Sequence, residues 1–280
     1  GEMLPLPHPF PKNCTLRGRG AKENFIIQRG LTATIFLPKG RKIDFPKKYS
    51  FWGTGGAMAT SLQVKSKQRV AAHGEVFTAE REVKAMCDLV ADECSRIDSR
   101  FLEPACGNGN FLAEVLRRKL EVVKRRYGKS RHEYERYAVL ALSSLYGVDI
   151  LNDNAEECRI RLLNLWNEEY YKTLAVSVCG ELLAAVRYIL ERNILCGDAL
   201  TLLRSDGTPI IFSEWSFISG DLIKRRDFRL DQLMKGEAEK QKRQNVLFMP
   251  GWEYDAELDT LIPSPIQEFE PIEYWRLCHA

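Results

Sequence analysis

The sequence predicts an α/β fold in which helices cover both faces of a mostly parallel sheet. Short apolar runs alternate along the chain with longer stretches that have the 3.6-residue period of amphipathic helices. Three of these runs end at an acid or at Gly-Asp, and ligands bind beyond the carboxyl ends of strands in open parallel sheets. The 280 residues, of which 45% are hydrophobic, suffice for one large domain or two small ones.

The predicted elements begin near residue 80. A helix is expected over 80–97, because Val83, Cys87 and Val90 share one face. A strand at 100–102 then leads through a glycine-bearing turn into a strong helix at 110–126, which Gly128 should end. The alternation continues with helix 131–145, strand 145–150, helices 153–172 and 176–192, and strands 194–196 and 209–212.

The flanking segments differ from this middle part in composition. Residues 1–73 hold 13 Lys and Arg against 3 Asp and Glu, whereas residues 246–280 hold 1 Arg against 7 acids. We expect a basic N-terminal arm over 1–73, with a possible β-hairpin at 24–37, a central domain over 74–245, and an acidic tail over 246–280 that wraps the domain rather than extending a sheet. A basic arm indicates a polyanionic partner or a solvated tail.

Several classes of protein are disfavoured by the composition. No window reaches the ~20 apolar residues that a membrane helix needs, and no leader peptide opens the chain. The eight cysteines include no C-x-x-C pair, and the four histidines form no ligand-like array, so we expect no metal site. Free cysteines of this kind predict a reducing cytoplasm.

Residues 103–112, EPACGNGNFL, carry the most specific pattern. A strand ends at Glu103, which can accept hydrogen bonds from an ammonium group. Gly107 and Gly109 then let the backbone approach a ligand without an intervening Cβ atom. A lone G-x-G is equally typical of a plain turn, and the third glycine of the dinucleotide fingerprint is missing.

Two further strand ends carry acids. Asp149 follows Gly147-Val148, and its carboxylate could accept from ribose hydroxyls or cap the next helix. Asp198 follows Gly197, and it could accept from an adenine amino group or cap the next helix.

Together these residues resemble the S-adenosylmethionine site of class I methyltransferases, above all those that methylate DNA adenine at N6. The segment Gly74–Val83, with Thr78, is similar to the G-x-[FVY]-x-T-P motif that precedes the glycine motif in enzymes of restriction–modification systems. The resemblance covers roughly residues 74–212. It implies a Rossmann-like class I methyltransferase fold, a cytoplasmic protein of bacterial or phage origin, and DNA as partner.

The resemblance also implies roles for single residues. Thr78 would contact the methionine carboxylate, and Asp149 the ribose hydroxyls. The other predicted cofactor-binding residues are Glu103, Pro104, Gly107 and Gly109 for the methionine part, Ile150 beside Asp149, and Asp198 with Ala199 for adenine. Ala79 stands where the family has proline. The 42 residues between Gly107 and Asp149 exceed one helix crossover, so the helix at 131–145 is a predicted insertion.

The family's catalytic motif, [NDS]-P-P-[YFW], is not present, because the chain contains no Pro-Pro. The corresponding stretch is 209–217, in which Ser213 could take the polar position and Trp215 or Phe217 could stack on a flipped base. Residues 213–217 are therefore either a divergent catalytic loop or the remnant of one in a non-catalytic or partner-completed protein. The 60–70 residues that follow are few for a target-recognition domain, so base readout would need a second subunit.

Three functional hypotheses follow from the sequence. The first is an S-adenosylmethionine-dependent DNA adenine methyltransferase or a subunit of one. The second is an inactive methyltransferase-fold subunit that binds cofactor and DNA or a partner chain, and the third is methylation of protein glutamine or of RNA. Basic runs at 117–119, 124–126, 224–229 and 240–243 are solvated faces or phosphate contacts, and the acidic tail could fold back on the basic arm or on the 224–243 segment.

Overall fold

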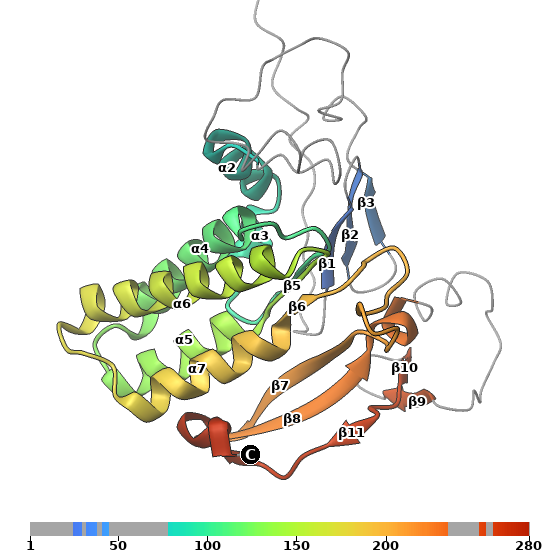
Figure 1. Cartoon of the computed structure of the whole chain (residues 1–280). Helices are drawn as coiled ribbons and strands as arrows, with labels where there is room; N and C mark the ends of the chain where they lie inside the picture. The colour runs from blue at the N-terminus through green and yellow to red at the C-terminus, as the bar shows by residue number, and fades with distance from the viewer. Residues whose placement is uncertain are drawn as a thin grey trace, which may run out of the picture.

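A computed structural model describes residues 25–29, 32–37, 41–44, 78–234, 252–255 and 260–279. Its main sheet has the order β3-β2-β1-β4-β5-β6 (Figure 1). The parallel part consists of β4 (Arg100–Glu103), β5 (Leu145–Asp149) and β6 (Ile194–Cys196), with β1 (Phe25–Arg29) parallel to β4. The strands β2 (Thr32–Leu37) and β3 (Arg41–Asp44) continue it antiparallel.

Three short strands within the N-terminal segment belong to the main sheet. The two β-rich runs form β1 and β2, and β1 pairs with β4 so that Ile27 lies opposite Leu102. These strands therefore extend the central sheet. The Gly-rich segment at 50–60, the upstream motif at 74–77 and the basic run at 240–243 lie outside the described residues.

Four long helices follow the sequence prediction closely. They are α4 (Asn110–Tyr127), α5 (Arg131–Ser143), α6 (Asn152–Leu174) and α7 (Gly180–Asn193). The helix expected over 80–97 is divided into α2 (Glu80–Leu89) and α3 (Ala91–Cys94), because Val90 leaves helical geometry at φ −121° and ψ 33°.

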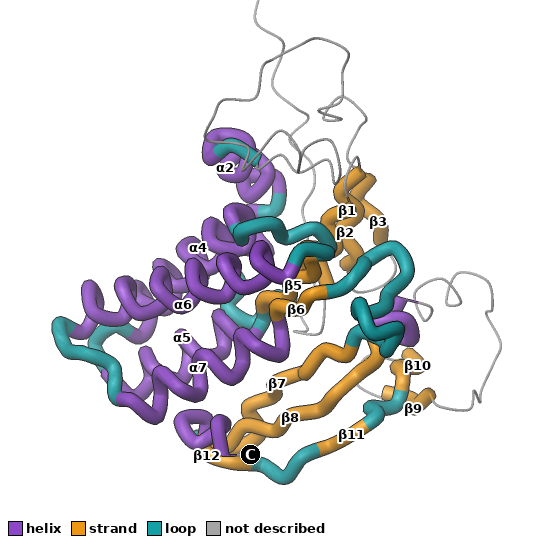
Figure 2. The backbone as a smooth tube through the Cα atoms, in the orientation of Figure 1, coloured by secondary structure: helices purple, strands orange, loops and turns teal. Residues whose placement is uncertain are grey.

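These four helices pack on one another and on a single face of the parallel strands (Figures 1 and 2). Strand side chains alternate between two clusters: Phe101, Leu145 and Ile194 face the helices, whereas Leu102, Tyr146 and Leu195 face the other side. Within the described residues, that second face is covered by Ile210, Phe212 and Leu230 and by the chain around 199–202, with no long helix there. The prediction that helices cover both faces of the sheet is therefore not met in the described residues, where the long helices lie on one face.

The segment after β6 departs most from the prediction. The expected short strand and loop at 209–217 form one long strand, β7 (Ile211–Ser219), which pairs antiparallel with β8 (Leu222–Arg229) in a second sheet. The tail adds to this sheet rather than only wrapping it, since β11 (Gln267–Glu268) and β12 (Ile272–Glu273) both pair with β8. The remaining strands β9 (Trp252–Asp255) and β10 (Thr260–Pro263) pair with each other, and the 3-10 helix η2 (Tyr274–His279) packs on α7.

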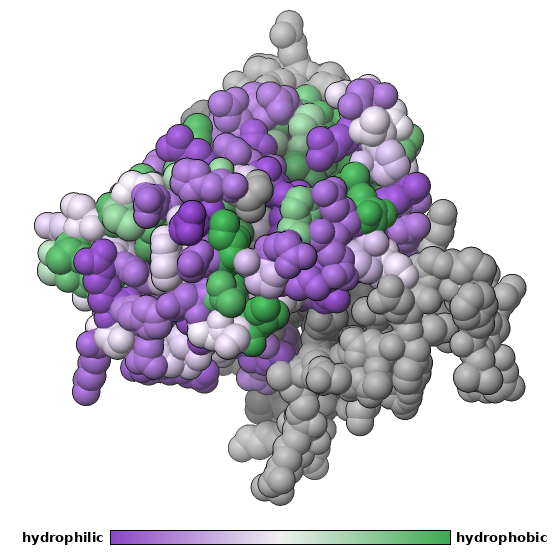
Figure 3. All heavy atoms as spheres, turned by 90° about the horizontal axis from the view of Figure 1, so that it is seen from below, coloured by the Kyte–Doolittle hydropathy of each residue, from purple (hydrophilic) through white to green (hydrophobic). Residues whose placement is uncertain are grey.

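Among the described residues seen from below, hydrophilic ones predominate, and apolar ones form a short central stripe with smaller patches toward the rim (Figure 3). A groove on α7 is lined by Leu183, Ala184, Tyr188 and Cys278, among others. None of the predicted site residues lines it.

The described helices include none that is long and apolar enough to cross a membrane. The described His, Cys, Asp and Glu side chains include no group of three suited to a metal ion.

Candidate functional site

The turn between β4 and α4 has the backbone geometry that its glycines allow. Gly107 has φ 51° and Gly109 has φ 86°, in the left-handed region that side chains rarely adopt. Gly109 also lies directly over α6, because a Cβ atom placed there would come within 2.7 Å of the Cys158 Sγ atom. The turn is therefore pressed against α6 and needs glycine at 109 for both reasons.

Asp149 joins this turn to the next strand end. Its carboxylate Oδ2 accepts a hydrogen bond from the Gly107 amide at 2.9 Å. The other oxygen, Oδ1, accepts from the Leu151 amide at 2.9 Å and from the Asn154 side-chain amide at 3.2 Å. Asp149 therefore fixes the glycine turn and also holds Leu151 and Asn154 at the start of α6, and Oδ2 retains a lone pair for a ligand hydroxyl.

Glu103 lies beside Asp149 but has far fewer hydrogen-bond donors around its carboxyl group. The side chain is 8% exposed, and its Oε2 atom is buried without a hydrogen-bond partner among the described residues. The pKa of Glu103 is raised to about 8, chiefly by burial and also by the nearby Asp149 carboxylate, against a lowering effect of the Ala105 amide. Asn108 in the same turn likewise has a buried Oδ1 atom without a described partner. The turn thus presents two acceptors and no donor for them.

Thr78 is held near the turn from the other side. The Asn110 side-chain amide donates to the Thr78 carbonyl at 3.1 Å, which links the start of α4 to the residues before α2. The Thr78 side chain is exposed. Thr78 and the glycine turn therefore belong to one region of the structure.

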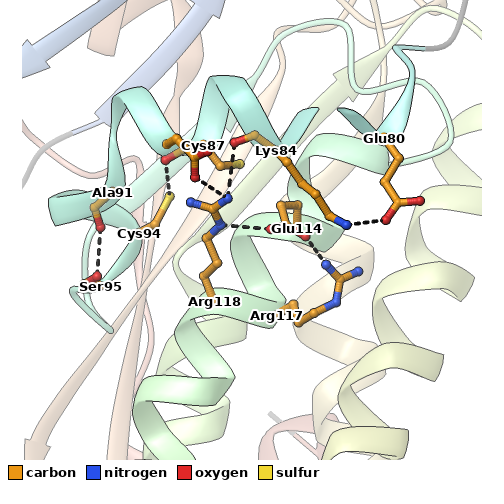
Figure 4. Close-up of polar contacts among 10 residues, drawn as sticks. Glu80, Lys84, Cys87, Ala91, Cys94, Ser95, Glu114, Arg117 and Arg118 are labelled. Atoms are coloured by element: carbon orange, nitrogen blue, oxygen red, sulfur yellow. Dashed lines mark hydrogen bonds and ion pairs between the residues drawn. The ribbon is translucent and has the colours of Figure 1, made fainter. Parts of the chain in front are cut away.

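The helix α2 is held on α4 by an ionic cluster (Figure 4). Arg118 of α4 bonds Asp88 at 2.8 Å and donates to the Lys84 carbonyl at 3.2 Å. The buried Glu114 accepts from Arg118 at 2.9 Å and also pairs with Arg117. Of the basic run at 117–119, Arg118 therefore holds α2 on α4, whereas Arg117 pairs with Glu114 on α4 itself.

The third strand end lies next to Asp149. The Gly197 amide donates to the Asp149 carbonyl at 2.9 Å, and the half-buried Asp198 accepts from the Leu200 amide at 2.8 Å in a local turn. Pro104 and Ala199 are half-buried, whereas Ile150 is 59% exposed. The carboxyl ends of β4, β5 and β6 therefore bring the predicted cofactor residues to one edge of the sheet.

The predicted catalytic residues are not at this edge. Ser213, Trp215 and Phe217 lie on one face of β7, and Ser213 and Trp215 are buried at 2% and 4% exposure. Trp215 donates from Nε1 to Asn193 at 2.9 Å, and Asn193 donates in turn to the carbonyls of Ser143 and Leu145, at the start of β5. Trp215 is thus at the amino ends of the strands, opposite Glu103 and Asp149.

The other two residues have structural partners of their own. Ser213 donates to Asp227 at 2.7 Å and accepts from Arg225 at 3.1 Å. The Phe217 ring is half-buried, packs edge-on against Tyr274 and lies 4.9 Å from the Arg136 guanidinium. The expectation of a loop at 213–217 is wrong, because the strand pairing with β8 continues through it.

Most basic residues of β8 are also paired within the protein. Lys224 bonds Glu268 of the tail at 2.6 Å, and Arg229 bonds Asp231 at 2.9 Å. Arg225 and Arg226 pair with Asp227 and Glu214, each at 2.6 Å. Part of the acidic tail does therefore lie on this basic strand. By contrast Lys124, Arg125 and Arg126, at the end of α4, are exposed and have no ion pair with a described acid.

Sequence reasoning missed Asn108, Asn110, Asn154 and Lys119. The first two lie inside the glycine motif, where a polar side chain between or after two glycines was a usable signal. Lys119 is completely buried and donates to the Ile97 carbonyl at 3.2 Å, to the Ser144 hydroxyl at 2.6 Å and to the Ser99 carbonyl. No pattern marked it, because it stands in a basic run.

Comparison with known proteins gives one partial match. The chain is 38% identical over 124 residues to the "Putative type II restriction enzyme and methyltransferase RM.MjaORFECS2P" of Methanocaldococcus jannaschii. The match covers 42% of this chain and 10% of that protein. No protein-family model matches the chain, and no solved structure matches it. Over this stretch the chain is similar to a protein whose name joins restriction with methylation.

Proposed function

We propose that the chain binds S-adenosylmethionine at the carboxyl ends of β4, β5 and β6 and serves in a restriction–modification system, in the methylation of adenine N6 in DNA. The observation that carries the proposal is the glycine turn tied to Asp149, with the unpartnered buried oxygen of Glu103 beside it. The partial similarity to a protein named for restriction and methylation supports the same assignment.

The residues present fit this cofactor. A left-handed turn without Cβ atoms at 107 and 109 leaves room for the methionine part, and the Glu103 and Asn108 oxygens can accept from its ammonium group. Asp149 can accept a ribose hydroxyl through Oδ2 while it still holds the Gly107 amide. The bound cofactor would supply a methyl group on a sulfonium.

The acceptor side of the reaction favours a second candidate function. Trp215 is buried at the opposite end of the strands, and Ser213 is buried with its hydroxyl bonded to Asp227 and Arg225, so neither side chain is available to a base held near Glu103 in this arrangement. A subunit that retains the cofactor site and relies on a partner chain for the methyl acceptor explains that burial. We infer that such a partner-completed or inactive subunit is the better-supported form of the proposal.

Calorimetry with S-adenosylmethionine tests the cofactor site. We expect saturable binding by the full chain that weakens at least tenfold in Asp149→Ala and stays unchanged in Asp206→Ala, an exposed acid that caps a distant turn. Absence of binding at millimolar cofactor, or equal binding by both variants, would contradict the assignment.

Methyl transfer then separates the two candidate functions. The lone chain is incubated with labelled cofactor and mixed-sequence DNA, with and without the chains that co-purify with it. Transfer only in the presence of a partner supports the partner-completed subunit. Transfer by the lone chain would instead mean that its own residues form the acceptor site.

A further inference from the structure

Two neighbouring carboxyl groups at the candidate site have opposite environments. Asp149 accepts three hydrogen bonds, from two backbone amides and one side-chain amide. Glu103 has one backbone donor, Ala105, for two oxygens, and its Oε2 atom is buried with no described donor. The donors around the turn therefore satisfy the Asp149 carboxylate, whereas ionising Glu103 costs the free energy of a buried charge with few hydrogen bonds.

The charged groups around Glu103 increase this difference. Asp149 on β5 is the charged neighbour that acts on Glu103 among the described residues, and it is an anion. The Cys106 thiol, in the turn itself, is buried, and its contact with Cys158 together with burial keeps its pKa well above the ordinary range, so it is neutral. No described Lys or Arg compensates for a Glu103 charge. Burial accordingly raises the Glu103 pKa to about 8, and the group carries its proton at neutral pH.

We propose that Glu103 is protonated in the free protein and releases that proton when a ligand brings an ammonium group to the Oε2 atom, so that the site selects cationic ligands through proton release. This inference rests on the proposed function for the identity of the ligand. The balance is simple: the carboxylic acid loses its proton to solvent, and the carboxylate formed pairs with the ligand's ammonium. No bond in the ligand changes.

Selectivity follows from the same step. A ligand that has the nucleoside part but no ammonium leaves Glu103 protonated and gains nothing from it. A ligand with the ammonium gains a buried ion pair, for which one proton must first leave. Below the Glu103 pKa, its observed affinity therefore increases about tenfold for each unit by which the pH is raised. Above the pKa, the affinity no longer changes with pH.

The ionisation state can be tested without any ligand. Because the folded-state pKa of Glu103 is raised, the folded protein holds this proton more tightly than the unfolded chain. The free energy of unfolding that the protonated carboxyl group contributes is fully present at pH values below its pKa in the unfolded chain. It is lost as the pH rises through the folded-state pKa of about 8. Urea unfolding from about pH 5 to about pH 9 should show the wild type losing stability relative to Glu103→Gln, whereas exposed Glu181→Gln follows the wild type. Parallel profiles for wild type and Glu103→Gln would overturn the proposal.

Calorimetry of binding tests the coupling. At about pH 6.5, titrations in phosphate and in Tris give the number of protons released from the dependence on buffer ionisation enthalpy. We expect close to one proton for S-adenosylmethionine and S-adenosylhomocysteine, and none for 5′-methylthioadenosine, which lacks the ammonium. Glu103→Gln should bind the first two with no proton release. Normal binding by the wild type without release overturns this inference and leaves the proposed function standing, whereas failure of every nucleoside probe to bind overturns both.

Discussion

The Asp149 carboxylate and the Gly107 amide, 42 residues apart, are joined by a hydrogen bond of 2.9 Å. This bond holds the end of β5 against the turn that follows β4. Since Asp149 also bonds the Leu151 amide and the Asn154 side chain, one carboxylate aligns the turn, the strand end and the start of α6. The candidate site therefore depends on a contact that neither segment could form alone.

The substitution Asp149→Asn should weaken both the fold and the site. The side-chain amide nitrogen that it introduces would face the Gly107 or the Leu151 amide, which leaves at least one buried donor unpaired. We expect a loss of about 1–3 kcal/mol in the free energy of unfolding. Urea denaturation measures it, with Asp206→Asn at an exposed turn as control. A variant as stable as the control would show that the hydrogen bond is dispensable.

Gly109→Ala should be far more costly than an alanine at another left-handed glycine. Gly109 and Gly207 have similar φ angles, 86° and 80°, but only the new Cβ atom at 109 meets an atom within 4 Å, the Cys158 Sγ. Gly207→Ala should therefore cost about 1–2 kcal/mol, the backbone strain alone. We expect Gly109→Ala to lose several kcal/mol in thermal unfolding.

A double substitution separates backbone strain from steric overlap at this position. Cys158→Ala removes the Sγ atom that would lie 2.7 Å from a Cβ atom at residue 109, although the Cys158 Cα remains at 3.3 Å. The pair Gly109→Ala with Cys158→Ala should therefore be less destabilised than the sum of the single variants. Simple additivity of the two losses would mean that the turn does not press on α6.

The helices and the parallel strands could be predicted from the sequence because each depends on local periodicity. Leu112, Val115 and Leu116 repeat at helical spacing, and Gly128 stands at the end that α4 adopts. The residues gathered at the sheet edge were also predictable, since parallel strands end at the same edge. The proton held by Glu103 was not, because it depends on how few donors the folded turn brings to one oxygen.

The placement of β7 could not be predicted for a related reason. Its alternation of Phe212, Ser213, Glu214 and Trp215 has the same period in any sheet. What takes it out of the parallel sheet is non-local: pairing with β8, and the ion pairs of Glu214 with Arg100 and Arg226. The resemblance assumed that the next strand stays in the parallel sheet, whereas β7 pairs with β8 in a second sheet.

Trp215→Ala should act as a core substitution rather than a site substitution. The side chain is 4% exposed and belongs to the cluster that includes the α7 side chains, so its loss should cost about 3–5 kcal/mol. Trp215→Phe should be milder and should chiefly remove the hydrogen bond to Asn193. Titration with S-adenosylmethionine should give equal affinity for folded Trp215→Phe and wild type. A selective loss of methyl transfer by a stable Trp215→Phe would restore a catalytic role.

Lys119→Met should be destabilising, and more so at high pH. The variant leaves the Ile97 and Ser99 carbonyls and the Ser144 hydroxyl without their shared donor, at a cost of about 1–3 kcal/mol or more. Burial lowers the Lys119 pKa to about 7 from 10.5, so between these values the unfolded chain binds this proton more tightly than the folded protein. The wild type therefore gains stability relative to Lys119→Met as pH rises through that interval. A pH-independent difference in unfolding free energy would contradict the lowered pKa.

DNA binding by the described part of the chain should depend on the end of α4 and not on β8. Lys124, Arg125 and Arg126 are exposed without a described acidic partner, whereas Lys224 and Arg229 already bond Glu268 and Asp231. Phosphate contacts release counterions, so removing one such contact lowers the slope of log affinity against log salt by about 0.9.

Fluorescence anisotropy with a mixed-sequence duplex between about 50 and 200 mM salt, the range over which phosphate contacts change affinity strongly, measures that slope. We expect alanine at all three α4 positions to reduce it by about 2–3, because up to three phosphate contacts are removed together. The matched control, Lys224→Ala with Arg229→Ala, removes two charges that are neutralised within the protein and should leave the slope unchanged. The reverse pattern would mean that DNA displaces the tail from β8, since Glu268 would then have to give up Lys224 for a phosphate to bind it.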